Sequence, residues 1–139
     1  MENLGEFIVN HWILSTAWIV LAWLVFSDAI NRKLTGLQPL DVNQSVRLVN
    51  QYKGKFIDVR EPDEFEKEHI ADSVNLPLSK LDEELKKLKN KSQPLVIVCA
   101  SGQRARNAAK KLKSNDFEEV YVMTGGINGW KEAKLPLFT

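Results

Sequence analysis

The chain is poor in the residues from which metal sites and disulfide frameworks are built. It has one cysteine, Cys99, and two histidines, His11 and His69. A single cysteine excludes an intramolecular disulfide framework. His11 lies in an apolar segment, which leaves one cysteine and His69, and this falls short of the usual ligand set of a structural or catalytic metal ion. We therefore expect no metal site and no cofactor.

The chain also has no excess of charge of either sign. Lys and Arg number 19, and Asp and Glu number 18, which gives a formal net charge of +1. This balance argues against a nucleic-acid-binding protein, which carries an excess of basic residues, and against an acidic disordered tail. The length of 139 residues suits one domain of ordinary size.

One segment lacks charge altogether. From Phe7 to Phe26 there is no Asp, Glu, Lys or Arg, and 16 of the 20 residues are hydrophobic. A helix of this length spans about 30 Å, the thickness of the hydrocarbon core of a bilayer. Three of the four tryptophans fall in the segment, two of them near its ends, as is typical at membrane interfaces. We predict a transmembrane helix over residues 7–26.

Two alternatives to a membrane anchor remain open. A cleaved signal peptide is disfavoured because Glu2 and Glu6 stand where a basic start is usual. A buried core helix is disfavoured because the remaining residues offer too small a core to surround it. Arg32 and Lys33 follow the segment and no basic residue precedes it, so the positive-inside rule places the C-terminal part in the cytoplasm. We expect a single-pass protein of the bacterial inner membrane with its N-terminus outside.

The rest of the chain alternates between strand and helix patterns, which is typical of an α/β fold with a mainly parallel sheet. We expect a short tail at 1–6, a linker at 27–36 and one domain at 37–139. Strands are expected at 56–59, 73–76, 95–98 and 119–123. Helices are expected at 41–49, 62–68, 78–88 and 104–112, with a short one from Gly126 to about Ala133.

Cys99 ends the most apolar of these strands and begins a short run that leads into a helix. In open α/β sheets the ligand site lies at the carboxyl ends of the strands. Gly102 lets the chain turn, and the small residues Ala100 and Ser101 let backbone N–H groups point inward. With the positive end of the following helix, such a loop stabilises an anion, here the thiolate of Cys99. The alternative is a buried cysteine that acts as a small hydrophobic residue.

The chain offers this cysteine no evident general base. His11 lies in the apolar segment, and His69 follows a charged helix without a pattern of its own, so a structural role suits it better. A cysteine–histidine hydrolase is therefore disfavoured. Two chemistries that need no base remain: a phosphatase, whose loop wraps a phosphate, and a sulfurtransferase, whose cysteine carries a persulfide.

A series of short motifs runs through the domain. In chain order they are Asp58-Val59-Arg60-Glu61, Glu64-Phe65, His69-Ile70-Ala71, Val74-Asn75-Leu76-Pro77, Val96-Ile97-Val98-Cys99 with Gly102 and Arg104-Ala105, Val120 to Val122, Gly125-Gly126, Gly129-Trp130, and Pro136. Each motif alone is weak, but in this order the set resembles the rhodanese-like family from about Leu37 to Phe138. One departure is visible, since the family usually has Gly directly before the His-Ile pair and this chain has Glu68.

The resemblance implies a mainly parallel five-stranded sheet flanked by helices, and a sulfurtransferase mechanism. Cys99 would take a sulfane sulfur from a donor such as thiosulfate, carry it as a persulfide, and pass it to cyanide or a thiol. Inward backbone amides suit this chemistry because they stabilise both thiolate and persulfide without a proton-transferring partner. The residues expected to form this active-site loop are Ala100, Ser101, Gly102, Gln103 and Arg104.

Three charged residues near this loop have two interpretations each. Arg104 either attracts an anionic donor or makes an ion pair at the start of its helix. Asp58 and Arg60 either border the site or form a structural ion pair with each other, and we favour the structural pair. Gly125, Gly126, Gly129 and Trp130 are expected to serve in turns and in the core.

Loop length separates the two remaining chemistries. Phosphatase sites of the protein-tyrosine type have five residues between cysteine and arginine, whereas four separate Cys99 from Arg104. The shorter loop makes a smaller bowl, which suits a sulfur atom better than a phosphate. An alternative of another class stays open, namely a membrane-tethered sulfur-relay or interaction module. Such a module would pass persulfide to a protein acceptor without turning over small molecules.

Overall fold

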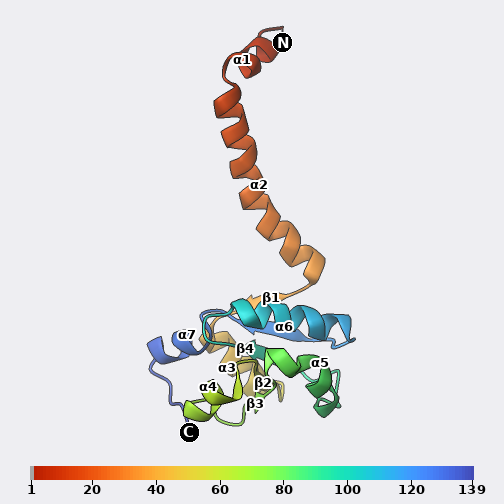
Figure 1. The fold of residues 1–139 in the computed structure, drawn as a ribbon, viewed down its shortest axis with the longest axis vertical. Helices are drawn as coiled ribbons and strands as arrows, with labels where there is room; N and C mark the ends of the chain where they lie inside the picture. The colour runs from red at the N-terminus through yellow and green to blue at the C-terminus, as the bar shows by residue number, and fades with distance from the viewer. Residues whose placement is uncertain (1) are drawn as a thin grey trace. The chain divides into compact units, whose positions relative to one another are not determined.

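The computed structural model describes residues 2–139, apart from some side chains of the N-terminal part, that of Arg32 among them. The chain divides into two compact units, residues 1–36 and residues 37–139 (Figure 1). The first unit consists of two helices, α1 (Glu2–Asn10) and α2 (Trp12–Thr35). The second unit contains all the strands and the remaining helices.

The N-terminal unit differs from the expected single helix over 7–26, because the helix breaks at His11. The Nδ1 atom of His11 lies 3.2 Å from the carbonyl oxygen of Phe7, which also accepts the backbone N–H of His11. The carbonyl oxygen of Phe7 thus has two contacts from His11 at the point where the two helices meet. The ring of His11 also stacks on the ring of Phe7, with the two ring centroids 4.6 Å apart.

The segment 27–36, expected as a linker, is helical as far as Thr35, because α2 continues to that residue. Residues 27–35 contain neither Gly nor Pro, so nothing in them ends a helix. Gly36 follows with φ +63°, the left-handed conformation that commonly terminates helices.

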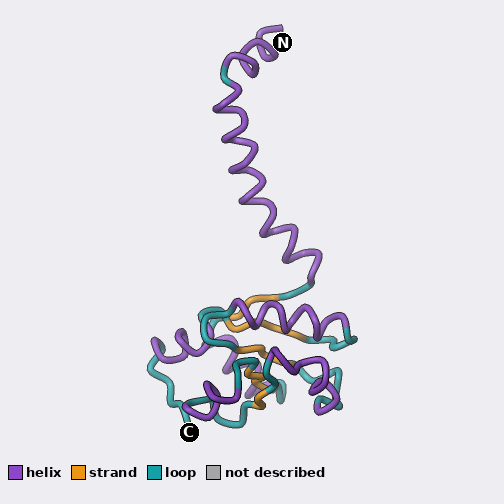
Figure 2. Tube along the Cα trace, viewed as in Figure 1, coloured by secondary structure: helices purple, strands orange, loops and turns teal. Residues whose placement is uncertain are grey.

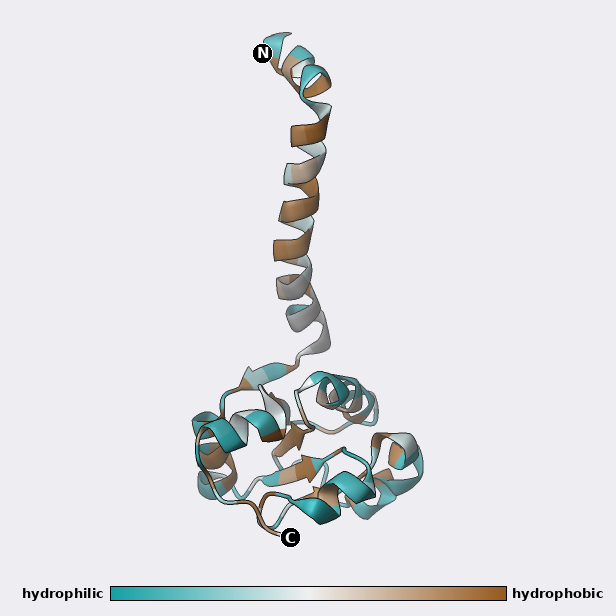
Figure 3. Ribbon diagram, turned by 60° about the vertical axis from the view of Figure 1, so that its left-hand side comes forward, coloured by the Kyte–Doolittle hydropathy of each residue, from teal (hydrophilic) through white to brown (hydrophobic). Residues whose placement is uncertain are grey.

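Most apolar side chains of the N-terminal unit are exposed. Figure 3 shows the hydrophobic residues as brown bands along α2. Trp12, Trp18 and Trp23 are 63%, 70% and 67% exposed. By length and composition no single helix of the described residues qualifies as a membrane span, whereas Asn3–Asn10 and Trp12–Ser27 qualify together, as a pair bent by 88°.

The second unit is an α/β domain built on a parallel sheet of five strands. The strands are β1 (Gln38–Leu40), β2 (Lys55–Asp58), β3 (Val74–Asn75), β4 (Leu95–Val98) and β5 (Val120–Met123). Their order in the sheet is β1-β5-β4-β2-β3, and every pair is parallel. Figure 2 shows these strands interleaved with helices along the chain. The predicted five-stranded parallel sheet is therefore confirmed.

The helices of this unit are α3 (Val42–Gln51), α4 (Pro62–Lys67), α5 (Leu81–Glu84), α6 (Gln103–Ser114) and α7 (Gly126–Glu132), with 3₁₀ turns η1 (Leu78–Lys80) and η2 (Leu85–Lys87) on either side of α5. The sequence locates α3 because Asp41 caps it, with its carboxylate accepting the N–H of Gln44 at 2.7 Å. The helix expected at 78–88 is instead divided into η1, α5 and η2.

Alternate residues of the central strands pack on opposite faces of the sheet. Ile57, Leu95 and Ile97 share a core with Ala108 and Leu112 of α6. Phe56, Val96, Val98 and Met123 face the other way and share a core with Trp130 of α7 and partly buried residues of α3. Both faces are therefore covered, which explains why all four residues of β4 are apolar and buried.

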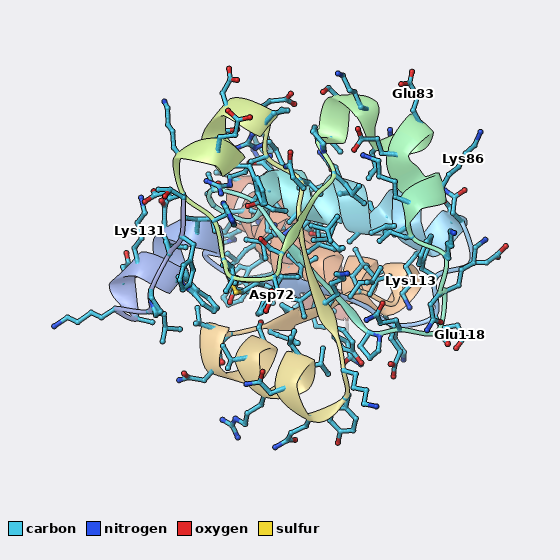
Figure 4. The ribbon with its side chains drawn as sticks, turned by 90° about the horizontal axis from the view of Figure 1, so that it is seen from below. Asp72, Glu83, Lys86, Lys113, Glu118 and Lys131 are labelled. Atoms are coloured by element: carbon cyan, nitrogen blue, oxygen red, sulfur yellow. The ribbon has the colours of Figure 1, made fainter. Side chains whose placement is uncertain are left out.

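The lysine-rich stretch 86–91 lies on the surface of the domain. Lys86, Lys87 and Lys89 are exposed. Figure 4 shows Glu83 and Lys86 pointing away from the domain on neighbouring turns. The lysines therefore form a solvated edge of the domain beside α5.

Candidate functional site

The candidate site forms where three neighbouring strands end at the same edge of the sheet. In the register of the sheet Asp58 of β2 lies beside Val98 of β4, and Ile97 lies beside Val122 of β5. The residues that follow these strands include Arg60 after β2, Cys99 after β4 and Gly126 after β5. The carboxyl ends of parallel strands are the usual location of ligand sites in such sheets.

Cys99 lies at the centre of this edge with its sulfur in a hydrogen bond. The residue is 1% exposed. Its Sγ accepts the backbone N–H of Gly102 at 2.8 Å. Gly102 has φ +110° and directly precedes α6, so the chain turns back over the sulfur just before the helix begins. The first N–H groups of a helix lack acceptors within it, so the start of α6 favours negative charge on the sulfur.

The first turn of α7 supports the loop from behind. The N–H of Ile127 donates to the carbonyl oxygen of Cys99 at 2.8 Å, and the N–H of Asn128 donates to that of Ala100 at 3.2 Å. Gly126 lies so close that a Cβ atom built on it would stand 2.1 Å from the oxygen of Cys99. Contact between two backbones at this distance requires glycine, and Gly126 also has φ +55°.

Arg104 does not point freely into the site, because Glu64 of α4 binds it through two hydrogen bonds. The two guanidinium nitrogens donate to Oε2 at 2.8 Å and to Oε1 at 3.0 Å. Oε2 also accepts the N–H of Glu61 at 3.0 Å. These bonds, first of all the one from Arg104, lower the pKa of Glu64 from 4.5 to about 2, and the same pair raises the pKa of Arg104.

The ion pair predicts a loss of stability in acid. Because the pKa of Glu64 is about 2 in the folded chain and 4.5 ordinarily, the stabilisation is complete above pH 4.5 and is lost as the pH falls toward 2. Both side chains are more than a third exposed, so we expect at most about 1 kcal/mol. Chemical unfolding between pH 6 and pH 2 should therefore show a smaller decrease for Glu64→Gln than for the unchanged chain. Glu66→Gln on the same helix should behave as the unchanged chain, and equal decreases in all three would contradict the prediction.

Asp58 and Arg60 form a buried ion pair with each other. They are 1% and 4% exposed. Arg60 donates from Nε and one terminal nitrogen to the carboxylate of Asp58 at 2.8–3.0 Å, and from the latter nitrogen to the carbonyl oxygen of Glu68 at 2.6 Å. Asn75 donates to the carbonyl oxygens of both residues. This geometry holds the loops after β2 and α4 together, and such a pair is strongly destabilising to break.

The departure from the family pattern at Glu68 has a structural explanation. Its backbone is extended, with φ −164° and ψ 140°, which any residue adopts. Its carboxylate pairs with Lys131 of α7, a residue labelled in Figure 4. Glycine is therefore not needed at this position, and the side chain ties α7 to the end of α4.

His69 has a structural setting and not that of a base. Its ring stacks on Phe65 with centroids 4.1 Å apart, and Nδ1 lies 2.9 Å from the carbonyl oxygen of Phe65. Its backbone exchanges two hydrogen bonds of 2.8 Å with Phe138. Within the described residues, no group of three or more His, Cys, Asp or Glu side chains is placed to hold a metal ion.

Comparison with known proteins identifies the family. The sequence model of the rhodanese-like domain matches residues 41–133. The chain belongs to the rhodanese-like domain family. The uncharacterized protein YibN of Escherichia coli K12 is 33% identical over 141 residues, a match that covers 99% of this chain and 97% of YibN.

Other relatives include enzymes named for sulfur transfer. The thiosulfate sulfurtransferase GlpE of Vibrio cholerae is 29% identical over 98 residues, which covers 70% of this chain and 92% of GlpE. Among solved structures, a rhodanese-related protein from Thermoplasma volcanium superposes with a TM-score of 0.64 at 30% identity, over 73% of this chain and 97% of that one. The fold of residues 37–139 is thus the rhodanese-like α/β fold.

The structure brings together the predicted loop residues and adds three to which the sequence assigns no role at the site. Cys99, Gly102 and the start of α6 lie together as expected. The additions are Glu64, which binds Arg104, and the N–H groups of Ile127 and Asn128. The motif containing Glu64 is visible in the sequence, but 40 positions separate it from Arg104.

Proposed function

We propose that the chain is a membrane-anchored sulfurtransferase that carries sulfane sulfur as a persulfide on Cys99. One observation carries the proposal: within a rhodanese-like domain, the Cys99 sulfur accepts the Gly102 N–H at the start of α6. Such a loop stabilises a thiolate and its persulfide without a base. The sulfurtransferase names of distant relatives such as GlpE support the same reaction class.

The reaction proceeds in two displacements. The Cys99 thiolate attacks the outer sulfur of thiosulfate, a new S–S bond forms, and the old one breaks with its electron pair leaving on sulfite. A thiophilic acceptor, such as cyanide, a small thiol or a thiol of a partner protein, then attacks the outer sulfur of the persulfide. Thiocyanate or a new persulfide leaves, and the Cys99 thiolate is restored.

The direct test is sulfur loading of the full chain in detergent. After exposure to a sulfane-sulfur donor and removal of the excess, mass spectrometry of the peptide containing Cys99 should show the added mass of one sulfur atom. Cyanide should then remove that mass and release thiocyanate. A chain that gains no sulfur from any donor would refute the proposal.

A phosphatase is the less suitable function for this loop. Four residues separate Cys99 from Arg104. The guanidinium group that a phosphatase would place on phosphate is bound instead by the carboxylate of Glu64. The arginine is a main source of anion stabilisation in such sites, so its engagement argues for sulfur transfer.

The membrane anchor is proposed for the apolar residues 7–26, with the domain in the cytoplasm. The support is the absence of charge over 20 residues, the exposure of the apolar side chains, and Arg32 and Lys33 after the segment. We expect the full chain to stay in the membrane fraction after washing with alkaline carbonate. Its release into the supernatant would contradict the anchor.

Orientation has a separate test. In spheroplasts, an external protease should leave residues 37–139 intact and should degrade them only after the membrane is permeabilised. Degradation in intact spheroplasts would reverse the proposed orientation while leaving the anchor itself in place.

A further inference from the structure

The charged side chains around Cys99 are already paired with one another. Arg60 is bound by Asp58 in a buried ion pair, and Arg104 by the two carboxylate oxygens of Glu64. Arg104 lies within electrostatic range of Cys99 and of Asp58, since both add to the bond from Glu64 in raising the pKa of Arg104. Two guanidinium groups and two carboxylates therefore leave no net charge for a substrate.

The loop itself adds no further cation. Between Cys99 and Arg104 stand only Ala100, Ser101, Gly102 and Gln103. At the sulfur an incoming donor thus meets the N–H of Gly102 and a loop that brings no unpaired cation. Such a site stabilises one negative charge on sulfur, but it offers no unpaired cation to the second charge of a compact dianion.

Glu64 holds Arg104 in this paired state at every working pH. The pKa of Glu64 is about 2, so the carboxylate is ionised throughout the neutral range. Its three hydrogen bonds, two from Arg104 and one from the N–H of Glu61, fix its position on α4. Rotation of Arg104 toward a bound anion would break both of its bonds to Glu64.

We infer that the donor is an organic persulfide in preference to thiosulfate, and that Glu64 sets this preference by binding Arg104. This inference rests on the proposed function, since it names the donor class of the same site. In an organic persulfide, R–S–SH, the sulfur to be transferred is terminal and any other charge is remote from the reacting bond. Thiosulfate brings its sulfonate group and both charges directly to the loop.

With this donor, loading of Cys99 is a single displacement at sulfur. The Cys99 thiolate attacks the terminal sulfur of R–S–SH and forms the Cys99 S–S bond. The S–S bond of the donor breaks, and its electron pair leaves on the thiolate R–S⁻. The proton stays on the transferred sulfur or passes to water, and no oxidant or reductant is consumed.

The first arm of the test compares donors on the unchanged full chain in detergent. Glutathione persulfide and thiosulfate are supplied separately, and the rate of sulfur loading on Cys99 is measured by mass spectrometry as a function of donor concentration. We expect the persulfide to load Cys99 more efficiently than thiosulfate by a factor of about ten or more. This factor corresponds to the one charge-assisted contact that thiosulfate lacks in this site.

The second arm changes the charge pairing. Glu64→Gln should raise the efficiency of thiosulfate about fivefold through a lower KM, with less than about a twofold change for the persulfide. Glu66→Gln is the matched control, because it removes the same charge from an exposed position on the same helix. If Glu64→Gln does not fold, Ser101→Arg supplies a cation at an exposed loop position and should lower the KM for thiosulfate.

The outcomes separate this inference from the function beneath it. Efficient loading by both donors in the unchanged chain would overturn the inference and leave the sulfurtransferase intact. A donor ratio unchanged by Glu64→Gln, or by Ser101→Arg in its place, would overturn the role of Arg104 pairing. No loading by either donor would overturn both the inference and the proposed function.

Discussion

Replacing Cys99 by serine is expected to reduce thiocyanate formation to background, a loss on the order of a thousandfold or more. The reason is chemical, because a serine oxygen is a far weaker nucleophile and cannot hold a sulfur atom as a persulfide. The buried position should tolerate the change, since the hydroxyl oxygen can accept the same N–H of Gly102. The measurement is thiocyanate released from a sulfane-sulfur donor and cyanide.

Two controls make this result specific. The free energy of unfolding of Cys99→Ser should remain within about 2 kcal/mol of the unchanged chain, which shows that the domain is folded. Cys99→Ala should be equally inactive, because the loss follows from the missing sulfur. Turnover that survives in either variant would place the chemistry on another residue and refute the role of Cys99.

Gly126→Ala is expected to produce the largest loss of stability among the glycine substitutions. The added Cβ would stand 2.1 Å from the oxygen of Cys99 and 2.8 Å from two atoms of Ala100, all of them backbone. Backbone atoms cannot rotate away, so the loop or α7 must move. With the strain of φ +55°, we expect a loss of about 3 to 5 kcal/mol in the free energy of unfolding.

Gly125→Ala provides the matched control for this prediction. The neighbouring residue also has a positive φ, +77°, but its nearest backbone atom would be 3.2 Å from the new Cβ. It should therefore show mainly the conformational strain, about 1 to 2 kcal/mol. Denaturant unfolding measures both variants. Equal losses in the two would show that the close approach of Gly126 to the loop is not needed for stability.

The two glycine variants also test whether the support of α7 affects the rate of sulfur loading on Cys99. A Gly126→Ala chain that still folds should load sulfur more slowly, because a displaced α7 no longer supports the carbonyl groups of Cys99 and Ala100. The loss of loading is expected to exceed that of Gly125→Ala. Equal loading rates in the two variants would separate the support of α7 from the reactivity of Cys99.

Much of the sheet and of the helix pattern can be predicted from the sequence, because the signals are local. The four apolar residues of β4 form a central strand because both faces of the sheet are covered. Asp41 marks the start of α3 because capping depends on residues within one turn. Elements without such local signals are the ones that the sequence does not reveal.

The elements that escape prediction depend on distant contacts or on weak local preferences. β1 has three residues, one of them Pro39, and forms a strand because β5 lies beside it at the edge of the sheet. Between Leu78 and Leu88 the leucines do face the core, but packing divides the segment into short turns. The break at His11 has no Gly or Pro beside it to mark it in the sequence.

In the candidate site, too, the features with local sequence signals can be predicted, and those that depend on distant contacts cannot. Cys99 and its loop are contiguous, so spacing alone indicates a nucleophile at a strand end. The partner of Arg104 is not contiguous with it, and only the fold brings Glu64 of α4 to the guanidinium group. Of the two roles that the sequence leaves open for Arg104, the structure shows the ion pair and supplies its partner, Glu64.

The support that α7 gives to the loop has a consequence for biosynthesis. Ribosomes make Cys99 before Ile127 and Asn128, whose N–H groups bind the carbonyls of Cys99 and Ala100. A nascent chain that ends before Gly126 therefore carries the thiol without the backbone contacts that shape its loop. The loop around Cys99 therefore gains its full set of backbone contacts only after α7 has been synthesised and has docked on it.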